Sequence, residues 1–179
     1  LNQKTKYEQE LLSNLESKFN FGKKPINRFN KSQMNESKNI LKKAEKLSEL
    51  KRKINSINNC NLKDNSKNLI MGDGNVNSSI MFIGEAPGVE EDNSGLSFQG
   101  NVRDLLRKML IAINIKLDDV YLSYSINFRP PDDRKPNSHE IKRYSVFLKE
   151  HITIINPKMI ILMGSTAMEC VTGLNDKIS

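Results

Sequence analysis

The chain has 179 residues, of which 37% are hydrophobic and 27% charged, and its formal net charge is +7 at pH 7. This length suits one ordinary core, and no stretch reaches the roughly 18 consecutive apolar residues of a membrane span. The start of the chain lacks the apolar segment of a secretory signal, so we expect a cytoplasmic protein without membrane association. Its two cysteines, Cys60 and Cys170, form no C-x-x-C pair, which excludes a disulfide framework and gives no basis for a metal site.

The positive charge is concentrated in the first part of the chain. Residues 1–68 carry 16 Lys and Arg against 7 Asp and Glu, whereas residues 69–179 carry 12 against 14. One explanation is a low-GC genome, which enriches Lys, Asn and Ile without selection for a ligand. The other is a basic arm whose lysines neutralise phosphates, which makes affinity for nucleic acid fall steeply with salt. Composition leaves both explanations open.

Residues 1–56 are predicted to form a basic, helical extension. Apolar residues recur at helical spacing over residues 7–21 and again from about residue 35 to residue 57. The segment between them contains Gly22 and Pro25 and is predicted to be a linker. We expect the second helix to pack on the following domain and the first to be a mobile or partner-binding extension.

Residues 57–179 are predicted to form an α/β domain with an incomplete C-terminal end. Short apolar runs separated by turn residues indicate strands. These runs lie at residues 69–71, 80–83, 120–124 and 159–163. A helical pattern follows each of the last three runs, so we expect a three-layer α/β/α fold with a central, mostly parallel sheet.

Three helices are predicted by different signals. The helix expected at about residues 101–114 has one apolar stripe, formed by Val102, Leu105, Leu106, Met109, Leu110 and Ile113. Asn137 and Glu140 form a capping box that starts the next helix. The last helix is expected to open at Gly164 and to end at Gly173.

Three unusual loops leave predicted strands at their carboxyl ends, where open parallel sheets bind ligands: residues 84–100, 127–137 and 164–166. The first, GEAPGVEEDNSGLSFQG, contains four glycines and four carboxylates. Its glycine spacing matches neither a dinucleotide-binding fingerprint nor a phosphate-binding Walker loop, and no Lys follows. Carboxylates at this place fit the stabilisation of positive charge on a sugar, or the positioning of a water or a metal ion.

A set of motifs carries a family resemblance over about residues 57–173. In chain order they are MFIGEAPGVEEDNSGLSFQG, LLRKML, DVYLSYSINFRPP, RKPNSHEI and PKMIILMGSTA. This ordered combination resembles the family-four uracil-DNA glycosylases of bacteria and archaea. The resemblance implies an enzyme of DNA base-excision repair, which flips a uracil into a pocket and hydrolyses its N-glycosidic bond to leave an abasic site.

The resemblance also implies roles for individual residues. Of the catalytic residues, it places Glu85 and Glu91 around the attacking water and the backbone of Ala86 close to the flipped base. For the flipped base it implies contacts with Gly84, Pro87, Gly88, Phe98 and Tyr124. Phe98 would stack on the base, and the alternative for Phe98 is a packed core aromatic. For the DNA backbone we expect contacts with Arg129, Arg134, Lys135 and Ser165.

One departure concerns the iron–sulfur cluster that the resemblance implies. The family carries four cysteine ligands, and the matching positions here hold Ile57, Cys60, Phe128 and Tyr144. A cluster needs about four thiolates, so we expect no cluster, no other metal and no other cofactor in this protein. Ile, Phe and Tyr are large enough to fill the vacated space with apolar packing.

Two further departures concern the base. The family carries an Asn that reads the uracil edge, and that position here is Tyr124, whose phenol offers one hydroxyl in a longer reach. Asn127 lies three residues too late to replace that Asn. The family's later His-containing loop has no counterpart before Ser179, and we expect His139 and His151 to be surface residues that do not stand in for it.

Three functions follow from these patterns. The leading hypothesis is a monomeric glycosylase that acts on uracil or another deaminated base in single- or double-stranded DNA. We expect hydrolysis without a covalent intermediate, because no Lys lies within residues 84–100. The second hypothesis is a non-catalytic nucleic-acid-binding member of the family with a degenerate pocket. The third is a repair-accessory protein whose N-terminal helices bind a protein partner that no residue pattern identifies.

Overall fold

A computed structural model of the chain describes residues 31–174, and the helix predicted at residues 7–21 lies outside this range. The chain divides into two units, Leu1–Ser37 and Lys38–Ser179. The sequence analysis placed the boundary at residue 57, whereas the second unit begins within a helix, because that helix contributes Leu50 and Ile54 to the buried core. No helix within residues 31–174 is long and apolar enough to cross a membrane.

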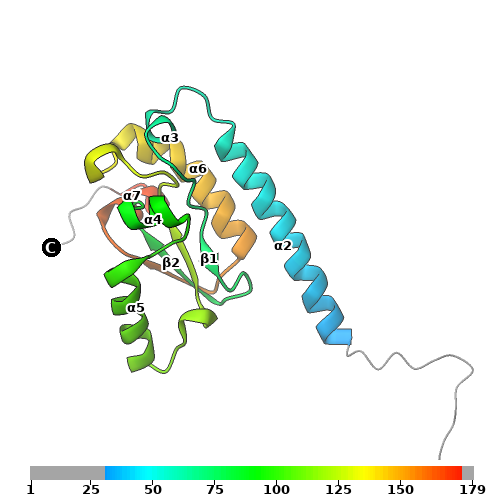
Figure 1. Cartoon of the computed structure of the whole chain (residues 1–179). Coiled ribbons are helices and arrows are strands. Elements are labelled where there is room, and N and C mark those ends of the chain that lie inside the picture. Colours follow the sequence, from blue (N-terminus) through cyan, green and yellow to red (C-terminus); the bar gives the residue numbers. More distant parts are fainter. Residues whose placement is uncertain (1–30, 175–179) are drawn as a thin grey trace, which may run out of the picture. The chain divides into compact units, whose positions relative to one another are not determined.

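A four-stranded sheet lies at the centre of the second unit (Figure 1). Its strands are β1 (Asp73–Gly74), β2 (Ile80–Gly84), β3 (Tyr121–Tyr124) and β4 (Met159–Leu162), in the order β1-β3-β2-β4. Because β2 is parallel to both β3 and β4, the prediction of a mostly parallel sheet is confirmed. The antiparallel edge strand β1 pairs through Asp73 and Gly74, and not through the predicted run at residues 69–71.

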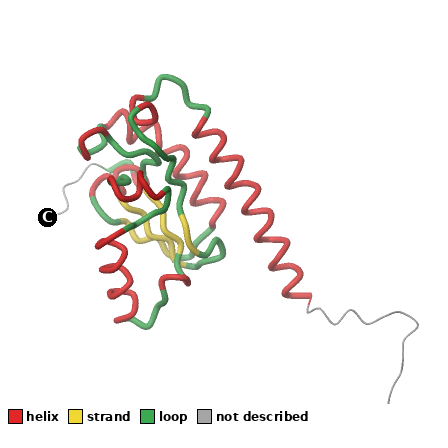
Figure 2. Tube along the Cα trace, viewed as in Figure 1, coloured by secondary structure: helices red, strands yellow, loops and turns green. Residues whose placement is uncertain are grey.

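Helices cover both faces of the sheet (Figure 2). α5 (Gly100–Ala112) packs on one face, while α6 (Ser138–Ile155) and α7 (Ser165–Thr172) pack on the other. The side chains of β2 alternate between these layers, since Phe82 packs with α5 while Met81 and Ile83 pack with α6 and α7. The predicted α/β/α arrangement is confirmed. The remaining elements are α2 (Lys31–Asn55), α3 (Asn61–Asp64), α4 (Val89–Ser94), η1 (Leu117–Asp119) and η2 (Pro131–Asp133).

The start of α6 and the end of α7 follow the sequence signals. The Asn137 side chain accepts a hydrogen bond from Glu140 N at 2.9 Å, and the Glu140 carboxylate accepts one from Asn137 N at 2.8 Å. This reciprocal pair is the predicted capping box. α7 ends at Thr172, and Gly173 follows in the left-handed conformation, as expected.

The apolar stripe of α5 is only partly buried. The helix forms where expected, and Leu106 and Leu110 lie buried against the sheet. The other residues of the predicted stripe are more than half exposed: Val102, Leu105, Met109 and Ile113. Leu106 and Leu110, spaced i, i+4, therefore attach this helix to the sheet. Among the described residues, the rest of the stripe faces away from the core.

The second half of α2 is fastened to the domain, as the sequence predicted. Lys43 Nζ donates to the backbone oxygens of Val76 and Ile155, at 3.0 and 2.7 Å. Ile155 ends α6, so the ammonium group satisfies a carbonyl that the helix leaves unpaired at its C-terminus. Lys53 Nζ also pairs with the Glu150 carboxylate of α6 at 2.8 Å.

His151 is buried, so the expectation that it lies on the surface was wrong. It lies on the inner side of α6, where its Nε2 is 2.9 Å from the Tyr121 hydroxyl and its Nδ1 is 3.3 Å from Ser123 Oγ. Burial lowers the pKa of His151 to about 4, so the ring is neutral at pH 7. His139 is exposed, as expected.

Acid is expected to destabilise the fold through His151. In the unfolded chain the His151 ring has its ordinary pKa of 6.5, so as the pH falls the unfolded chain binds a proton before the folded protein does. The contribution of the neutral ring to the free energy of unfolding is therefore fully present above pH 6.5 and declines as the pH falls to about 4. The loss in the free energy of unfolding is roughly 3 kcal/mol, at about 1.4 kcal/mol per pKa unit. Urea unfolding at pH 7 and pH 4.5 measures it. This pH dependence should shrink in His151→Gln and persist in His139→Gln; an undiminished dependence in His151→Gln would contradict the assignment.

Candidate active site

The loops that follow β2 and β3 meet around one cavity of about 200 Å³. From the β2 side it is lined by Glu85, Ala86, Pro87 and Gly88, and from the β3 side by Pro130, Asp133, Arg134, Lys135 and Pro136. Both loops leave the carboxyl ends of parallel strands, where α/β folds place their ligands. Two of the three loops that the sequence marked as a site line this cavity, and the third, residues 164–166, is hydrogen-bonded to Glu85 of the first.

Glu85 lines this cavity and is held at the start of α7. Its Oε1 accepts hydrogen bonds from Thr166 N at 3.0 Å and from Ser165 Oγ at 3.4 Å. Gly164 is required beside it, because a Cβ at that position, where φ is +109°, would lie 2.5 Å from the Glu85 side chain. Among residues 38–174 no hydrogen-bond donor engages Oε2. One oxygen of Glu85 is thus fixed, and the other can contact a ligand or a water.

Glu91 connects two parts of its own loop to β3. Its Oε2 accepts from Gly88 N at 2.9 Å, and its Oε1 accepts from Gln99 N at 2.8 Å and from the Tyr124 hydroxyl at 3.2 Å. The carboxylate also caps the short helix α4 and is 7% exposed. These contacts give Glu91 a structural role, since its two oxygens are already occupied by donors. Its predicted role beside the attacking water stays a prediction.

Phe98 and Tyr124 form a buried stack. Their ring centroids are 4.7 Å apart with 15° between the ring planes, and the two side chains are 2% and 6% exposed. Phe98 has a φ of +50°, unusual for a bulky residue, and its N–H donates to the Tyr124 hydroxyl at 3.2 Å. Burial, followed by the Glu91 charge, raises the pKa of Tyr124, so the phenol stays protonated. The ring on which a base was predicted to stack is therefore covered by Tyr124.

The basic residues of the loop after β3 differ in their pairing. Arg129 binds Asp133 through two hydrogen bonds of 2.7 and 3.1 Å, and Arg134 binds Glu140 through two of 2.7 and 2.9 Å. Lys135 is exposed, and no acidic partner reaches it among the residues that the structure describes. Of these three predicted DNA contacts, Lys135 is the one available to a phosphate without first breaking an ion pair.

Sequence reasoning missed Pro130, Asp133 and Pro136 as lining residues. Pro130 and Pro136 lie in the quoted motifs DVYLSYSINFRPP and RKPNSHEI, and Asp133 lies between these two motifs, but no periodicity indicates which side chains of this segment face the cavity. Asp132 and Asp133 both have left-handed backbones, with φ of 57° and 52°, and this bend sets the course of the loop. Asn127 is buried, and its side-chain amide donates a hydrogen bond to Ile70 O at 2.9 Å. It therefore joins the segment after β3 to the segment before β1.

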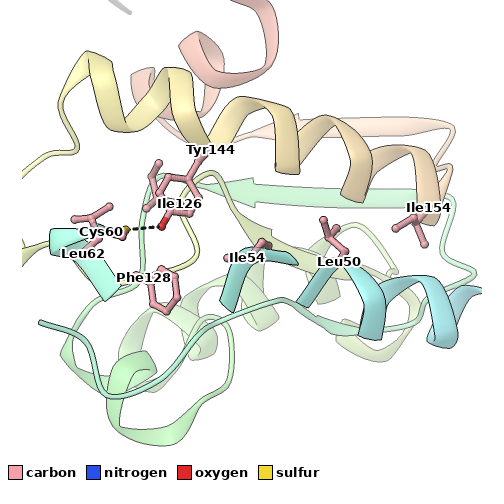
Figure 3. Close-up of a cluster of buried hydrophobic side chains, with 8 residues drawn as sticks. All are labelled: Leu50, Ile54, Cys60, Leu62, Ile126, Phe128, Tyr144 and Ile154. Atoms are coloured by element: carbon pink, nitrogen blue, oxygen red, sulfur yellow. Dashed lines mark hydrogen bonds between the residues drawn. The ribbon is translucent and has the colours of Figure 1, made fainter. Parts of the chain in front are cut away.

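Three of the four positions matching the family's cluster ligands, Cys60, Phe128 and Tyr144, lie together at one corner of the core (Figure 3). Cys60 Sγ lies 3.2 Å from the Tyr144 hydroxyl, and the Tyr144 ring meets Phe128 edge-on at 6.4 Å between centroids. Ile57 packs against this cluster from the side. No group of three or more His, Cys, Asp or Glu side chains able to hold a metal ion occurs within the described residues. One thiol among apolar and aromatic side chains does not fit an iron–sulfur cluster.

This corner is connected to the candidate site. Ala86, which lines the cavity, packs against the same cluster of buried side chains. The other members of the cluster come from α2, α3, α6 and the segment after β3: Leu50, Ile54, Leu62, Ile126 and Ile154. The packing at the corner therefore supports the backbone of the loop after β2.

Comparison with known proteins identifies relatives of this chain. Residues 71–178, more than half of the chain, match the Uracil DNA glycosylase superfamily. The chain is 39% identical over 109 residues to the Type-4 uracil-DNA glycosylase of Thermotoga maritima, a match that covers 61% of this chain and 57% of that protein. It is 34% identical over 132 residues to the protein of the same name from Archaeoglobus fulgidus, and this match covers 74% of this chain and 66% of that protein.

A third relative is the Type-4 uracil-DNA glycosylase of Pyrobaculum aerophilum, which is 34% identical to this chain over a match that covers 60% of that protein. The chain spans about three fifths of the length of these curated relatives. The matched residues contain the loops after β2 and β3 and the start of α7 that surround Glu85. The chain therefore belongs to the uracil DNA glycosylase superfamily.

Proposed function

We propose that this protein is a DNA glycosylase that hydrolyses the N-glycosidic bond of uracil, or of another deaminated base, flipped out of DNA during base-excision repair. The observation that carries the proposal is the position of Glu85, which is fixed by one oxygen at the start of α7 and lines the cavity between two loops. Family membership and relatives named Type-4 uracil-DNA glycosylases support the same reaction.

The chemistry assigned to Glu85 follows from charge. Cleavage of the bond between base and deoxyribose builds positive charge on the sugar, and a carboxylate nearby stabilises that charge. Water supplies the oxygen that adds to the sugar carbon, and its proton balances the departing base. Ala86 and Gly88 beside Glu85 are small, so the backbone of this turn can approach the ligand closely.

DNA is the proposed partner, bound first through its phosphates. Lys135 at the rim of the cavity is assigned to the backbone next to the flipped nucleotide. The ion pairs of Arg129 with Asp133 and of Arg134 with Glu140 hold the loop in place. The basic residues of α2 extend the positive potential along the chain. We propose that the protein acts as a monomer.

We further propose that the protein folds and acts without the family's iron–sulfur cluster and without another cofactor. The support is the corner around Tyr144, where Ile57 and Phe128 occupy positions that match the family's cluster ligands. Cys60 Sγ is hydrogen-bonded to the Tyr144 hydroxyl there. Apolar packing takes over the structural task that a cluster would have at this place.

A second function, nucleic-acid binding without catalysis, is favoured by the stack of Tyr124 on Phe98. The Phe98 ring on which a base would stack is covered by Tyr124. Tyr124 also occupies the position of the family's base-reading Asn.

Base release distinguishes the two functions. The complete reading frame that contains this chain is incubated with oligonucleotides carrying uracil, hypoxanthine or xanthine, and abasic sites are counted after alkaline cleavage. We expect uracil to be released by the parent and not by the Glu85→Ala, Phe98→Ala double variant. No release of any base, with DNA binding retained, favours the non-catalytic function.

A further inference from the structure

We propose that Tyr124 is a gate: its ring occupies the place on Phe98 where a flipped base would stack, and it leaves that place when a base binds. The inference rests on the proposed function for the role of Phe98. Everything else in it comes from the packing and hydrogen bonding of Tyr124.

The Tyr124 ring packs against both Phe98 and the end of β2. It stacks on Phe98 nearly parallel, with 4.7 Å between the ring centroids, which is the geometry of an offset aromatic pair. A Cβ on Gly84 would lie 2.7 Å from Tyr124 Cε1 and 3.0 Å from Phe98 Cζ, so the edge of the stacked pair lies directly against the Gly84 backbone. Gly84 begins the loop assigned to the base. The ring therefore occupies a slot bounded by two of the residues predicted to contact the base.

Two hydrogen bonds latch the ring in this slot. The hydroxyl donates to Glu91 Oε1 and accepts from Phe98 N, each at 3.2 Å. Glu91 keeps two further partners when the phenol leaves, Gly88 N and Gln99 N. The loop thus retains its main fastening while the ring swings away. A side chain latched to the loop but not essential to its shape has the properties of a gate.

The gate has a consequence for specificity. An Asn at this position would pair with the edge of a uracil, whereas the Tyr124 ring competes with every base for the same face of Phe98. The parent is therefore expected to bind a flipped uracil weakly and to distinguish it poorly from thymine. Removing the ring should raise affinity for uracil more than affinity for thymine.

Binding to an uncleavable substrate tests the gate. The probe is a single-stranded oligonucleotide with one 2′-fluoro-2′-deoxyuridine, compared with the same oligonucleotide carrying thymidine. We expect Tyr124→Asn to bind the uracil probe about tenfold more tightly than the parent does, because no aromatic stack and latch must be broken. Tyr124→Phe keeps the stack but removes the two hydrogen bonds of the hydroxyl, so its affinity for the uracil probe should lie between that of the parent and that of Tyr124→Asn. Unchanged or weaker uracil binding in Tyr124→Asn would overturn the gate.

Uracil release by the same proteins separates this inference from the proposed function. Tighter uracil binding by Tyr124→Asn with no release by any variant supports the gate and rejects hydrolysis. Release by the parent that is lost in Tyr124→Asn, without a gain in binding, supports hydrolysis and rejects the gate, because Tyr124 then assists the reaction.

A measurement on the unaltered sequence covers the case in which Tyr124→Asn does not fold. The parent is labelled with 3-fluorotyrosine, and the Tyr124 ¹⁹F resonance is assigned by its loss in Tyr124→Phe. Saturation with the uracil probe is expected to shift this resonance as the ring leaves Phe98. An unshifted resonance at saturation contradicts the gate.

Discussion

Replacing Glu85 with Gln is expected to lower the single-turnover rate of uracil release by about 10²- to 10³-fold, the range for removing one preorganised group that stabilises transition-state charge. The substitution removes the negative charge but keeps an oxygen acceptor for Thr166 N and Ser165 Oγ. The start of α7 therefore retains its hydrogen bonds, and the loss reports on the reaction. The measurement is abasic-site formation in a uracil oligonucleotide with the protein in excess.

Glu90→Gln is the matched control for this variant. It removes the same charge from the same loop, at an exposed position that does not line the cavity. We expect little change in its rate. An equal loss in both variants would assign the effect to the charge of the loop as a whole, and an undiminished rate in Glu85→Gln would remove Glu85 from the reaction.

Tyr144→Ala is expected to lower the free energy of unfolding by about 3–5 kcal/mol, the range for truncating a large aromatic side chain in a core. Tyr144 is 1% exposed, and its ring packs between Phe128 and Phe147 at 6.4 and 6.2 Å between centroids. Tyr144→Phe removes only the hydroxyl next to Cys60 Sγ and should lower it by about 1 kcal/mol. Urea unfolding at 25 °C measures both values.

Val146→Ala is the control on the same helix, since Val146 is 65% exposed and its truncation should change stability by no more than about 0.5 kcal/mol. Iron and acid-labile sulfide are measured in the same purified parent protein, where we expect neither at the stoichiometry of a cluster. A stoichiometric cluster would contradict the packed corner, and so would a loss in Tyr144→Ala no larger than in Val146→Ala.

The fold followed from patterns that are local in the sequence. The apolar run of β2 and the capping box of Asn137 and Glu140 each depend on residues a few positions apart, and both were confirmed. Periodicity also located α5, but it could not show that only Leu106 and Leu110 contact the sheet. How much of a stripe is buried depends on the neighbouring elements, which no single helix pattern contains.

The position of the candidate site could be predicted from the sequence, but the hydrogen bonds and the aromatic stack within it could not. Motif spacing identified Glu85 and the loop after β3, and parallel strands brought them to one cavity. The stack of Phe98 on Tyr124 joins residues 26 apart and depends on a left-handed backbone at Phe98, which its residue type does not suggest. His151 likewise became buried through partners on β3 that are distant in sequence.

The most direct test of the central claim is the detection of free uracil by mass spectrometry, together with the abasic strand, after incubation of the complete reading frame with a uracil-containing oligonucleotide. We expect one free uracil for each abasic site, a strand that stays unbroken until alkali is added, and no covalent adduct trapped by borohydride. DNA that is bound but retains all its uracil would contradict it.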